Sequence, residues 1–217
     1  MNEGKRSIAR LAYGLVAVGL LVAATMAVLV ARPATVIAST PPCDFMTGGG
    51  WIVHAGAHAN FGVGGGCKDG SPTWGHLEYI DHGTGLKVHW TSITAYLPAV
   101  DDVTSVDPKT GQPTGTRNIC GTASTNMFGD VNFAVRAKDA GEPGVNDQFD
   151  IRLTDPIFNL PLYDTFTECS NSNHYLGSSA PCSPGSGGGG NIQLHKPNPS
   201  TTGSFGGACP ALGGKVV

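Results

Sequence analysis

Four acidic side chains within twelve residues are the strongest candidate for chemistry in this sequence. They are Asp139, Glu142, Asp147 and Asp150. Glycine and proline residues lie between them, which gives the segment the composition of a turn. Calcium takes six to eight oxygen ligands, and a turn-rich acidic segment can supply them, although this spacing is not that of an EF-hand loop. The segment therefore predicts either a calcium site or an ordinary solvated hairpin turn, and no other cofactor is expected.

Histidines form a second candidate. The set with suitable spacing is His76, Glu78, His82 and His89. A hairpin centred near residues 83–85 would bring these side chains to one sheet face, where three imidazoles and a carboxylate suit zinc or copper. Lys87 on the same face disfavours a cation, and the alternative is a wet face on which His and Glu pair across strands. His54 and His58 would align only on a helix, and their segment does not have a helical pattern.

Aromatic side chains suggest a binding surface. Trp74 and Tyr79, together with His76, are the residues that we expect to line a ligand surface. Aromatic faces stack well on the apolar faces of pyranose rings, so a carbohydrate-binding module is one functional hypothesis. Trp90 follows Leu86 and Val88 at a spacing of two, and we expect these three residues in the core.

No catalytic motif is recognisable. The sequence has no Gly-x-Ser-x-Gly nucleophile elbow and no cysteine beside a plausible base. Paired carboxylates for glycoside hydrolysis are recognised by their separation in space, which the sequence does not give. We therefore expect a protein that is not an enzyme, with a hydrolase as the least favoured alternative.

The six cysteines predict disulfides. They are Cys43, Cys67, Cys120, Cys169, Cys182 and Cys209. The absence of a CxxC pair argues against a zinc site, and six cysteines allow 15 pairings. Cys169 with Cys182 is the best single pairing, because it closes a loop that otherwise has little core. The pairing of the other four stays open.

The N-terminal segment predicts export. Residues 1–10 carry three positive charges, and residues 11–30 carry no charge. Val36-Ile37-Ala38 then has the small residue that a signal peptidase requires. Twenty apolar residues also span about 30 Å as a helix, so a retained transmembrane anchor is the alternative to a cleaved signal. Both alternatives place the following domain outside the cytoplasm, secreted or on the cell envelope.

The charge balance limits the partners. Of 13 Lys and Arg residues, four precede residue 39, and of 16 Asp and Glu residues, one does. The remaining 179 residues therefore carry a net charge of −6 with His neutral. This argues against nucleic acid and against anionic lipid, so the membrane is contacted only through an uncleaved N-terminal segment. A cell-envelope protein or polysaccharide is the expected partner.

Apolar residues after residue 40 recur at a spacing of two. The clearest strands are residues 86–91, 131–136, 149–154 and 192–195, and further strands are expected at 49–54, 58–63, 74–80, 93–97 and 117–124. Eight or nine short strands separated by Gly, Pro and Asp turns predict an all-β antiparallel sandwich, Ig-like or jelly-roll-like. The N-terminal signal or transmembrane helix would be the only helix.

The domain boundaries follow from this pattern. We predict a signal peptide or anchor over residues 1–38, a sandwich domain over 39–196 and a Gly/Pro/Ser-rich tail over 197–217 that its disulfide holds. Residues 100–116 have the composition of an exposed loop, and residues 161–184 show little periodicity. The glycines at 187–190 precede a strand directly, so we expect them to permit close backbone approach or a bulge rather than to form a linker.

Five ordered motifs resemble one known family. They are TGGGWI at 47–52, WGHLEYIDH at 74–82, LKVH at 86–89, DAGEPG at 139–144 and GGGNIQLHK at 188–196. Together they are similar to the post-COAP domain, an extracellular bacterial β module of uncharacterised role. The resemblance covers residues 43–196 and implies a secreted or surface β domain without catalytic residues. The segment around Cys169 and Cys182 and the Cys209 tail depart from the family pattern. The leading expectation is a disulfide-stabilised surface domain with an interaction or structural role.

Overall fold

The computed structural model describes residues 43–67, 74–185, 188–201, 203–210 and 212. All of them belong to one compact unit, Thr40–Val217. The predicted signal or anchor helix lies outside these residues. Within the part of the chain that the structure describes, no helix has the length and apolar character that crossing a bilayer would require.

The fold is all-β, as the spacing of apolar residues predicts. The described residues form eleven strands: β1 Phe45–His54, β2 Ala57–Gly66, β3 Trp74–Asp81, β4 Lys87–Pro98, β5 Ser105–Val106, β6 Pro113–Thr125, β7 Gly129–Asp139, β8 Gln148–Thr154, β9 Pro161–Asp164, β10 His174–Tyr175 and β11 Gly190–His195. The prediction of eight or nine strands was too low. It omitted β5, β9 and β10, which have two to four residues each and are too short to show a period of two. The segments predicted at 86–91 and 93–97 are one strand, β4.

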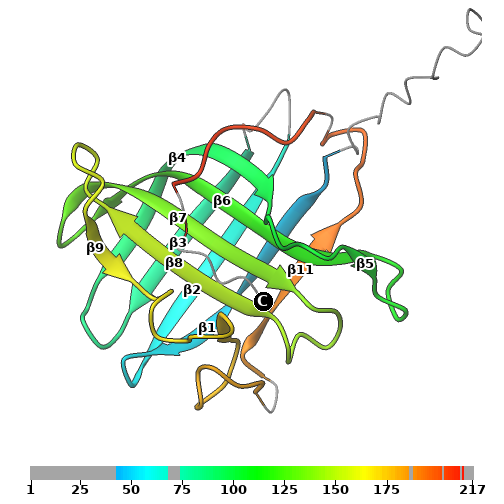
Figure 1. Ribbon diagram of the computed structural model, residues 1–217, viewed down its shortest axis with the longest axis horizontal. Coiled ribbons are helices and arrows are strands. Elements are labelled where there is room, and N and C mark those ends of the chain that lie inside the picture. The colour runs from blue at the N-terminus through cyan, green and yellow to red at the C-terminus, as the bar shows by residue number, and fades with distance from the viewer. Residues whose placement is uncertain (1–42, 68–73, 186–187, 202, 211, 213–217) are drawn as a thin grey trace, which may run out of the picture. The chain divides into compact units, whose positions relative to one another are not determined.

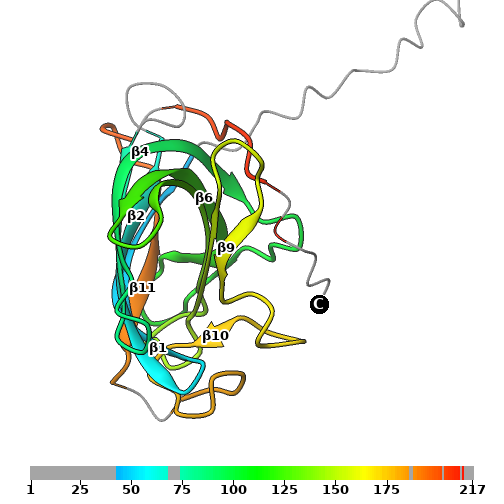
Figure 2. The ribbon, with the colours of Figure 1, turned by 90° about the vertical axis from the view of Figure 1, so that its left-hand side faces the viewer.

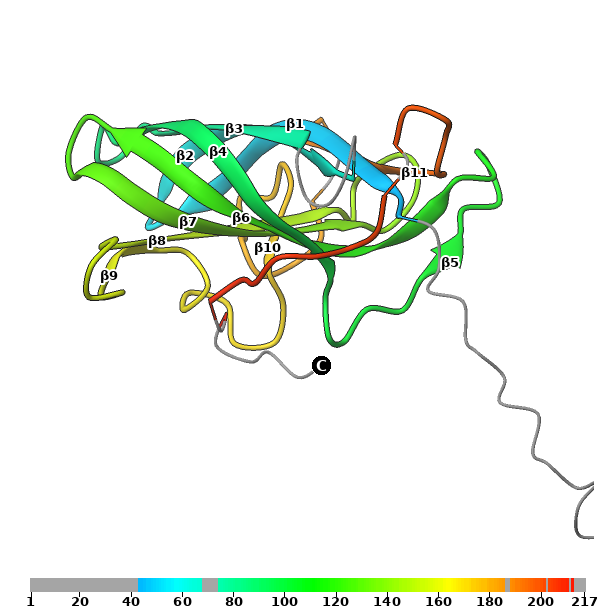
Figure 3. The same cartoon turned by 90° about the horizontal axis from the view of Figure 1, so that it is seen from above.

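The strands form one continuous antiparallel sheet rather than two separate ones. Its order is β10-β8-β7-β6-β4-β3-β2-β1-β11, with β5 on β6 and β9 on β8. The sheet curves strongly, so that β11 at one end contacts β6 and β7 (Figure 1). Seen from the side, β1, β2 and β11 face β6 and β9 across the interior (Figure 2). From above, β1 to β3 lie over β6 to β8 (Figure 3).

The core fills the inside of this curve. Phe61 of β2 stacks on Phe149 of β8 with ring centroids 3.8 Å apart, and Tyr79 of β3 lies against the same ring. Each fully buried side chain of this size contributes about 1.5–3 kcal/mol. Val88 is buried and Trp90 packs against the core cluster, as predicted. The alternation of apolar and polar residues along each strand therefore determines which face of the sheet packs in the core.

The glycines at the start of β11 permit close backbone approach, as predicted. A Cβ at Gly189 would lie 1.9 Å from the backbone nitrogen of Gly177. At Gly190, which has a φ of 122°, a Cβ would lie 2.2 Å from the carbonyl oxygen of Gly49. No other residue fits at these two crossings.

Three disulfides hold the domain together. Cys169–Cys182 confirms the best predicted pairing, and the others are Cys43–Cys67 and Cys120–Cys209. The last bond fixes the predicted tail to β6, and Gly206 of the tail also bridges Tyr96 of β4 (Figure 1, red). Three disulfides fit a protein of an oxidising, extracellular environment.

Candidate functional site

Two histidines and one glutamate converge at one end of the curved sheet. His54 ends β1, Glu168 lies in the connection after β9, and His174 begins β10. Glu168 Oε2 is 2.7 Å from His54 Nδ1 and 3.0 Å from His174 Nε2. Among the described residues, this is the only set of three His, Cys, Asp or Glu residues whose ligand atoms all lie within 4.8 Å of one another. We call it the His–Glu cluster.

The buried side of the His–Glu cluster is held by further polar groups. Asp150 Oδ1 lies 2.6 Å from His174 Nδ1 and accepts a hydrogen bond from the Thr165 hydroxyl at 2.7 Å. The His174 side chain is 0 % exposed. Its burial opposes a positive charge, but the hydrogen bonds to Asp150 and Glu168 outweigh that effect and raise the pKa of His174. His174 is therefore fixed at both ring nitrogens.

The β1–β2 turn supplies the exposed side of the cluster. Ala55 and Gly56 both have left-handed backbone conformations, with φ of 50° and 82°. This tight turn aims the Ala55 N–H at Glu168 Oε2, at 3.1 Å. Burial raises the pKa of Glu168, but the hydrogen bonds from Ala55, His174 and His54 outweigh it and lower that pKa. Glu168 thus holds a negative charge that three groups share.

A pair of tyrosines borders the cluster. The Tyr79 and Tyr163 hydroxyls are 2.7 Å apart, and the Tyr163 hydroxyl donates to Asp81 at 3.1 Å. The Tyr163 ring meets the His54 ring edge-on. Burial raises the pKa of Tyr79 well above its usual value. Tyr79 is fully buried, so it lies away from the ligand surface on which we expected it.

The acidic loop of residues 139–150 accepts hydrogen bonds from the backbone of β11. Asp139 Oδ2 accepts the Leu194 N–H and Asp147 Oδ2 accepts the Ile192 N–H, each at 2.7 Å. Glu142 accepts a bond from the Asn191 side chain at 3.0 Å. Asp150, the fourth predicted ligand, instead faces His174. Calcium binding by these four carboxylates stays a prediction, and the ion would have to compete with the hydrogen bonds that close the sheet.

The predicted outer-face histidines do not gather at one point. His89 Nδ1 contacts Glu78 across β3 and β4, as the alternative of cross-strand pairing predicts. His82 Nε2 lies 2.7 Å from Asn60 Oδ1. His76 lies beside Trp74, whose ring also meets Phe45 edge-on. Trp74 and His76 are half-buried on this face and remain candidates for a ligand surface.

A groove crosses the outer face of β1 to β3. Its volume is about 410 Å³, and its lining residues are Gly50, Trp51, Asn60, Phe61, Gly62, Glu78, Ile80 and residues 188–190. The Trp51 ring stacks on His58 with centroids 4.2 Å apart. The main-chain N–H of Trp51 donates to the Gly189 carbonyl at 2.8 Å, and the main-chain carbonyl of Trp51 accepts from the Gly177 N–H at 3.0 Å. These bonds fix the main chain of Trp51, and His58 covers one face of its ring. We call the feature the Trp51 groove.

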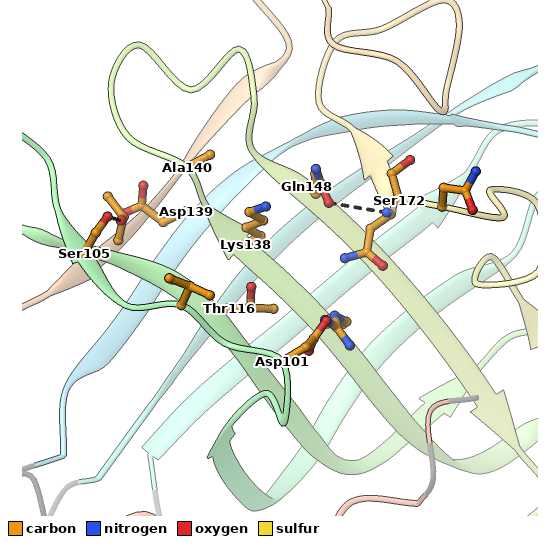
Figure 4. A pocket seen from close by; sticks show the side chains of 14 residues that line it. Asp101, Ser105, Thr116, Lys138, Asp139, Ala140, Gln148 and Ser172 are labelled. Atoms are coloured by element: carbon orange, nitrogen blue, oxygen red, sulfur yellow. Dashed lines mark hydrogen bonds and ion pairs between the residues drawn. The ribbon is translucent and has the colours of Figure 1, made fainter. Parts of the chain in front are cut away.

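A second hollow lies over β6, β7 and β8, also of about 410 Å³ (Figure 4). Lys138 and Gln148 point from its floor, and Asp101 pairs with Arg136 at one side. The Asn173 N–H donates to Gln148 Oε1 at 3.3 Å, while the buried Oδ1 of Asn173 has no hydrogen-bond partner in the described ranges. None of its lining residues is aromatic. It is a polar cleft, unlike the Trp51 groove.

Sequence reasoning missed both Glu168 and His174. Both lie in the segment that shows little periodicity, and His54 is 114 positions from Glu168. The only signal nearby was the predicted Cys169–Cys182 bridge, which begins next to Glu168 and encloses His174. Comparisons of the chain with protein-family models, with curated proteins and with solved structures gave no match.

Proposed function

We propose that this chain is an exported, non-catalytic binding domain that recognises a polysaccharide of the cell envelope through the Trp51 groove. The observation that carries the proposal is the composition of the groove. One indole, stacked on His58, lies beside an amide and a carboxylate, over a floor of glycine backbone.

The chemistry of a sugar matches these groups. A pyranose ring has an apolar C–H face that packs on an aromatic ring, and hydroxyl groups along its edge. Asn60 and Glu78 supply an amide and a carboxylate at the groove. Asn60 Oδ1 contacts His82 and Glu78 Oε1 contacts His89, so Asn60 Nδ2 and Glu78 Oε2 are the atoms that would bond to sugar hydroxyls. The floor is open above Gly62, where an added Cβ would meet no atom within 4 Å. A ring can therefore approach the sheet closely at this position.

The rest of the proposal concerns the setting of the domain. Export through residues 1–38, either cleaved or retained as an anchor, would place the domain at the cell surface. The curved sheet, with β1 to β3 over β6 to β8, would act as a rigid sandwich-like scaffold that three disulfides stabilise. The resemblance to the post-COAP domain is in keeping with this role.

Substitution of Gly62 gives the sharpest test. Leucine at this position would fill the groove while the space above it leaves the fold intact. We expect the purified wild-type protein to co-sediment saturably with cell walls or insoluble polysaccharides, and both Gly62→Leu and Trp51→Ala to lose at least tenfold in affinity. Phe158→Ala is the matched control, because it removes an exposed aromatic ring that does not line the groove, and melting temperatures verify that each variant is folded.

Two outcomes would contradict the proposal. Wild-type protein that pellets with no polysaccharide would exclude a polysaccharide ligand. Binding that persists in folded Gly62→Leu but is lost in Lys138→Ala would move the site to the polar cleft of Figure 4.

A further inference from the structure

We propose that His54, Glu168 and His174 form a zinc site with one coordination position open to solvent. This site is independent of the Trp51 groove, since the groove lines the outer face and the two sets share no residue. The proposal rests on ligand chemistry, spacing, the surrounding hydrogen bonds and the way the chain fixes the three side chains.

The ligand atoms have nearly the spacing that zinc requires. In a tetrahedral site with bonds of about 2.0 Å, neighbouring ligand atoms are about 3.3 Å apart. Glu168 Oε2 is 2.7 Å from His54 Nδ1 and 3.0 Å from His174 Nε2. The third pair, His54 Nδ1 and His174 Nε2, lies within 4.8 Å. If the two contacts of Glu168 widened by about half an ångström and the two ring nitrogens took the same separation, the cluster would admit the ion. Two imidazoles and one carboxylate are a common three-residue set of zinc sites that keep a fourth position for water.

Asp150 acts as the outer partner that a metal-binding histidine needs. It accepts the Nδ1–H of His174, so that Nε2 is the nitrogen that faces Glu168. This contact fixes the ring orientation and raises the basicity of the nitrogen that would bind the metal. The Thr165 hydroxyl in turn donates to Asp150. For zinc to bind, His174 Nε2 would release its proton to solvent, and the proton on His54 Nδ1 would move to its Nε2 through solvent. His174 Nδ1 would keep its proton and its hydrogen bond to Asp150.

The chain brings the three ligands together from separate elements and then fixes them. The disulfide Cys169–Cys182 begins next to Glu168 and closes a loop that contains His174. The backbone of β10 pairs with β8, opposite Phe149 of the core. His54 is positioned by the end of β1, next to the Ala55–Gly56 turn. Little ordering is left for the ion to impose, which favours binding.

Burial differs among the ligands in a way that suits an open metal site. The side chain of His174 is 0 % exposed, that of His54 is 16 % exposed and that of Glu168 is 28 % exposed. A water molecule can therefore reach the fourth position from the side of Glu168. The nitrogen ligands favour zinc over calcium and magnesium, which prefer oxygen ligands alone.

The test is metal binding by the purified protein with its disulfides formed. After treatment with a chelator, we expect titration with zinc chloride to show one site per chain in calorimetry. Cobalt(II) chloride should give the strong visible absorption of a tetrahedral complex. His54→Ala and Glu168→Gln should each weaken zinc binding at least tenfold. His89→Ala is the matched control, because it removes an exposed histidine that also pairs with a glutamate.

A purely structural hydrogen-bonded cluster predicts a different result. With micromolar protein, such a cluster would show no heat of zinc binding, no cobalt absorption spectrum and no rise in melting temperature with added zinc. The absence of any one of these signals in the wild type would overturn the proposal. Zinc binding that is equal in wild type and in folded His54→Ala would also overturn it. Because His54 lies at the rim, circular dichroism is expected to show that His54→Ala is folded, and Glu168→Gln provides a second, nearly isosteric variant.

Discussion

The acidic loop and the His–Glu cluster contain similar groups and use them in opposite ways. In the acidic loop, Asp139 and Asp147 accept hydrogen bonds from backbone N–H groups of β11, so their oxygens close the sheet. In the His–Glu cluster, one oxygen of Glu168 faces two ring nitrogens that come from different strands. Carboxylates that satisfy the backbone are structural, and groups that converge on one point are the better candidates for a ligand.

The difference lies in what surrounds each carboxylate. β11 has one edge paired with β1, and its other edge would present unpaired N–H groups. The acidic loop supplies the acceptors that a further strand would otherwise provide. Near Glu168 the only backbone donor that contacts the carboxylate, among the residues described, is the N–H of Ala55. The other contacts are imidazoles, which exchange a proton for a metal ion.

The largest expected effect comes from Asp147→Ala. It removes the acceptors of the Ile192 and Ala140 N–H groups, which lie 2.7 and 2.9 Å from the carboxylate. One buried and one partly buried donor left unpaired destabilise a fold by about 3–4 kcal/mol together. Urea unfolding should show this loss, and hydrogen exchange should accelerate at Ile192, whereas zinc affinity should not change. A loss below 1 kcal/mol would mean that the acidic loop does not close the sheet.

The second effect is that of removing the bridge beside the His–Glu cluster. The double variant Cys169→Ser, Cys182→Ser opens a loop whose ends are 13 positions apart. In the chain-entropy model this lowers stability by about 3 kcal/mol. We expect zinc affinity to fall as well, because Glu168 and His174 lose their fixed positions. Calorimetry with the double variant measures this, and an unchanged affinity would show that the bridge does not organise the cluster.

The smallest effect is a dependence of stability on pH. Burial raises the pKa of Asp147 to about 7, despite the hydrogen bonds from Ala140 and Ile192. The unfolded value is about 3.9, so the folded state binds the proton more tightly between these two values. The free energy of unfolding should therefore fall as pH rises from about 4 to 7, and Asp147 should change it little above pH 7. Between pH 5 and pH 8 the expected loss of stability is about 2 kcal/mol.

Asp147→Asn isolates this contribution, because its amide does not titrate. Urea midpoints at pH 5 and pH 8 should differ less in the variant than in the wild type. His174, whose pKa is also raised, changes stability in the same direction in both proteins and cancels in the comparison. If the urea midpoint changed equally between pH 5 and pH 8 in the two proteins, Asp147 would already be ionised at pH 5.

The two regions also show what the sequence can predict. The alternation of apolar residues located β7, β8 and β11, and the cysteine spacing identified one bridge, because both signals are local. The acidic loop was also visible, since its residues are close in sequence. Its role was not, because β11 lies more than forty positions further along the chain. The His–Glu cluster was invisible for the same reason, as its first member precedes the others by more than a hundred positions.

The pairing of β1 with β11 determines when the protein can finish folding. The Thr47 hydroxyl and the His195 ring hydrogen-bond at 2.9 Å, although they are 148 positions apart. A chain that emerges N-terminus first exposes one edge of β1 until nearly all of the domain has appeared. Such long-range pairing is slow, and an open edge attracts other strands. We therefore expect incomplete chains to associate through this edge of β1, and the arrival of β11 to end that association.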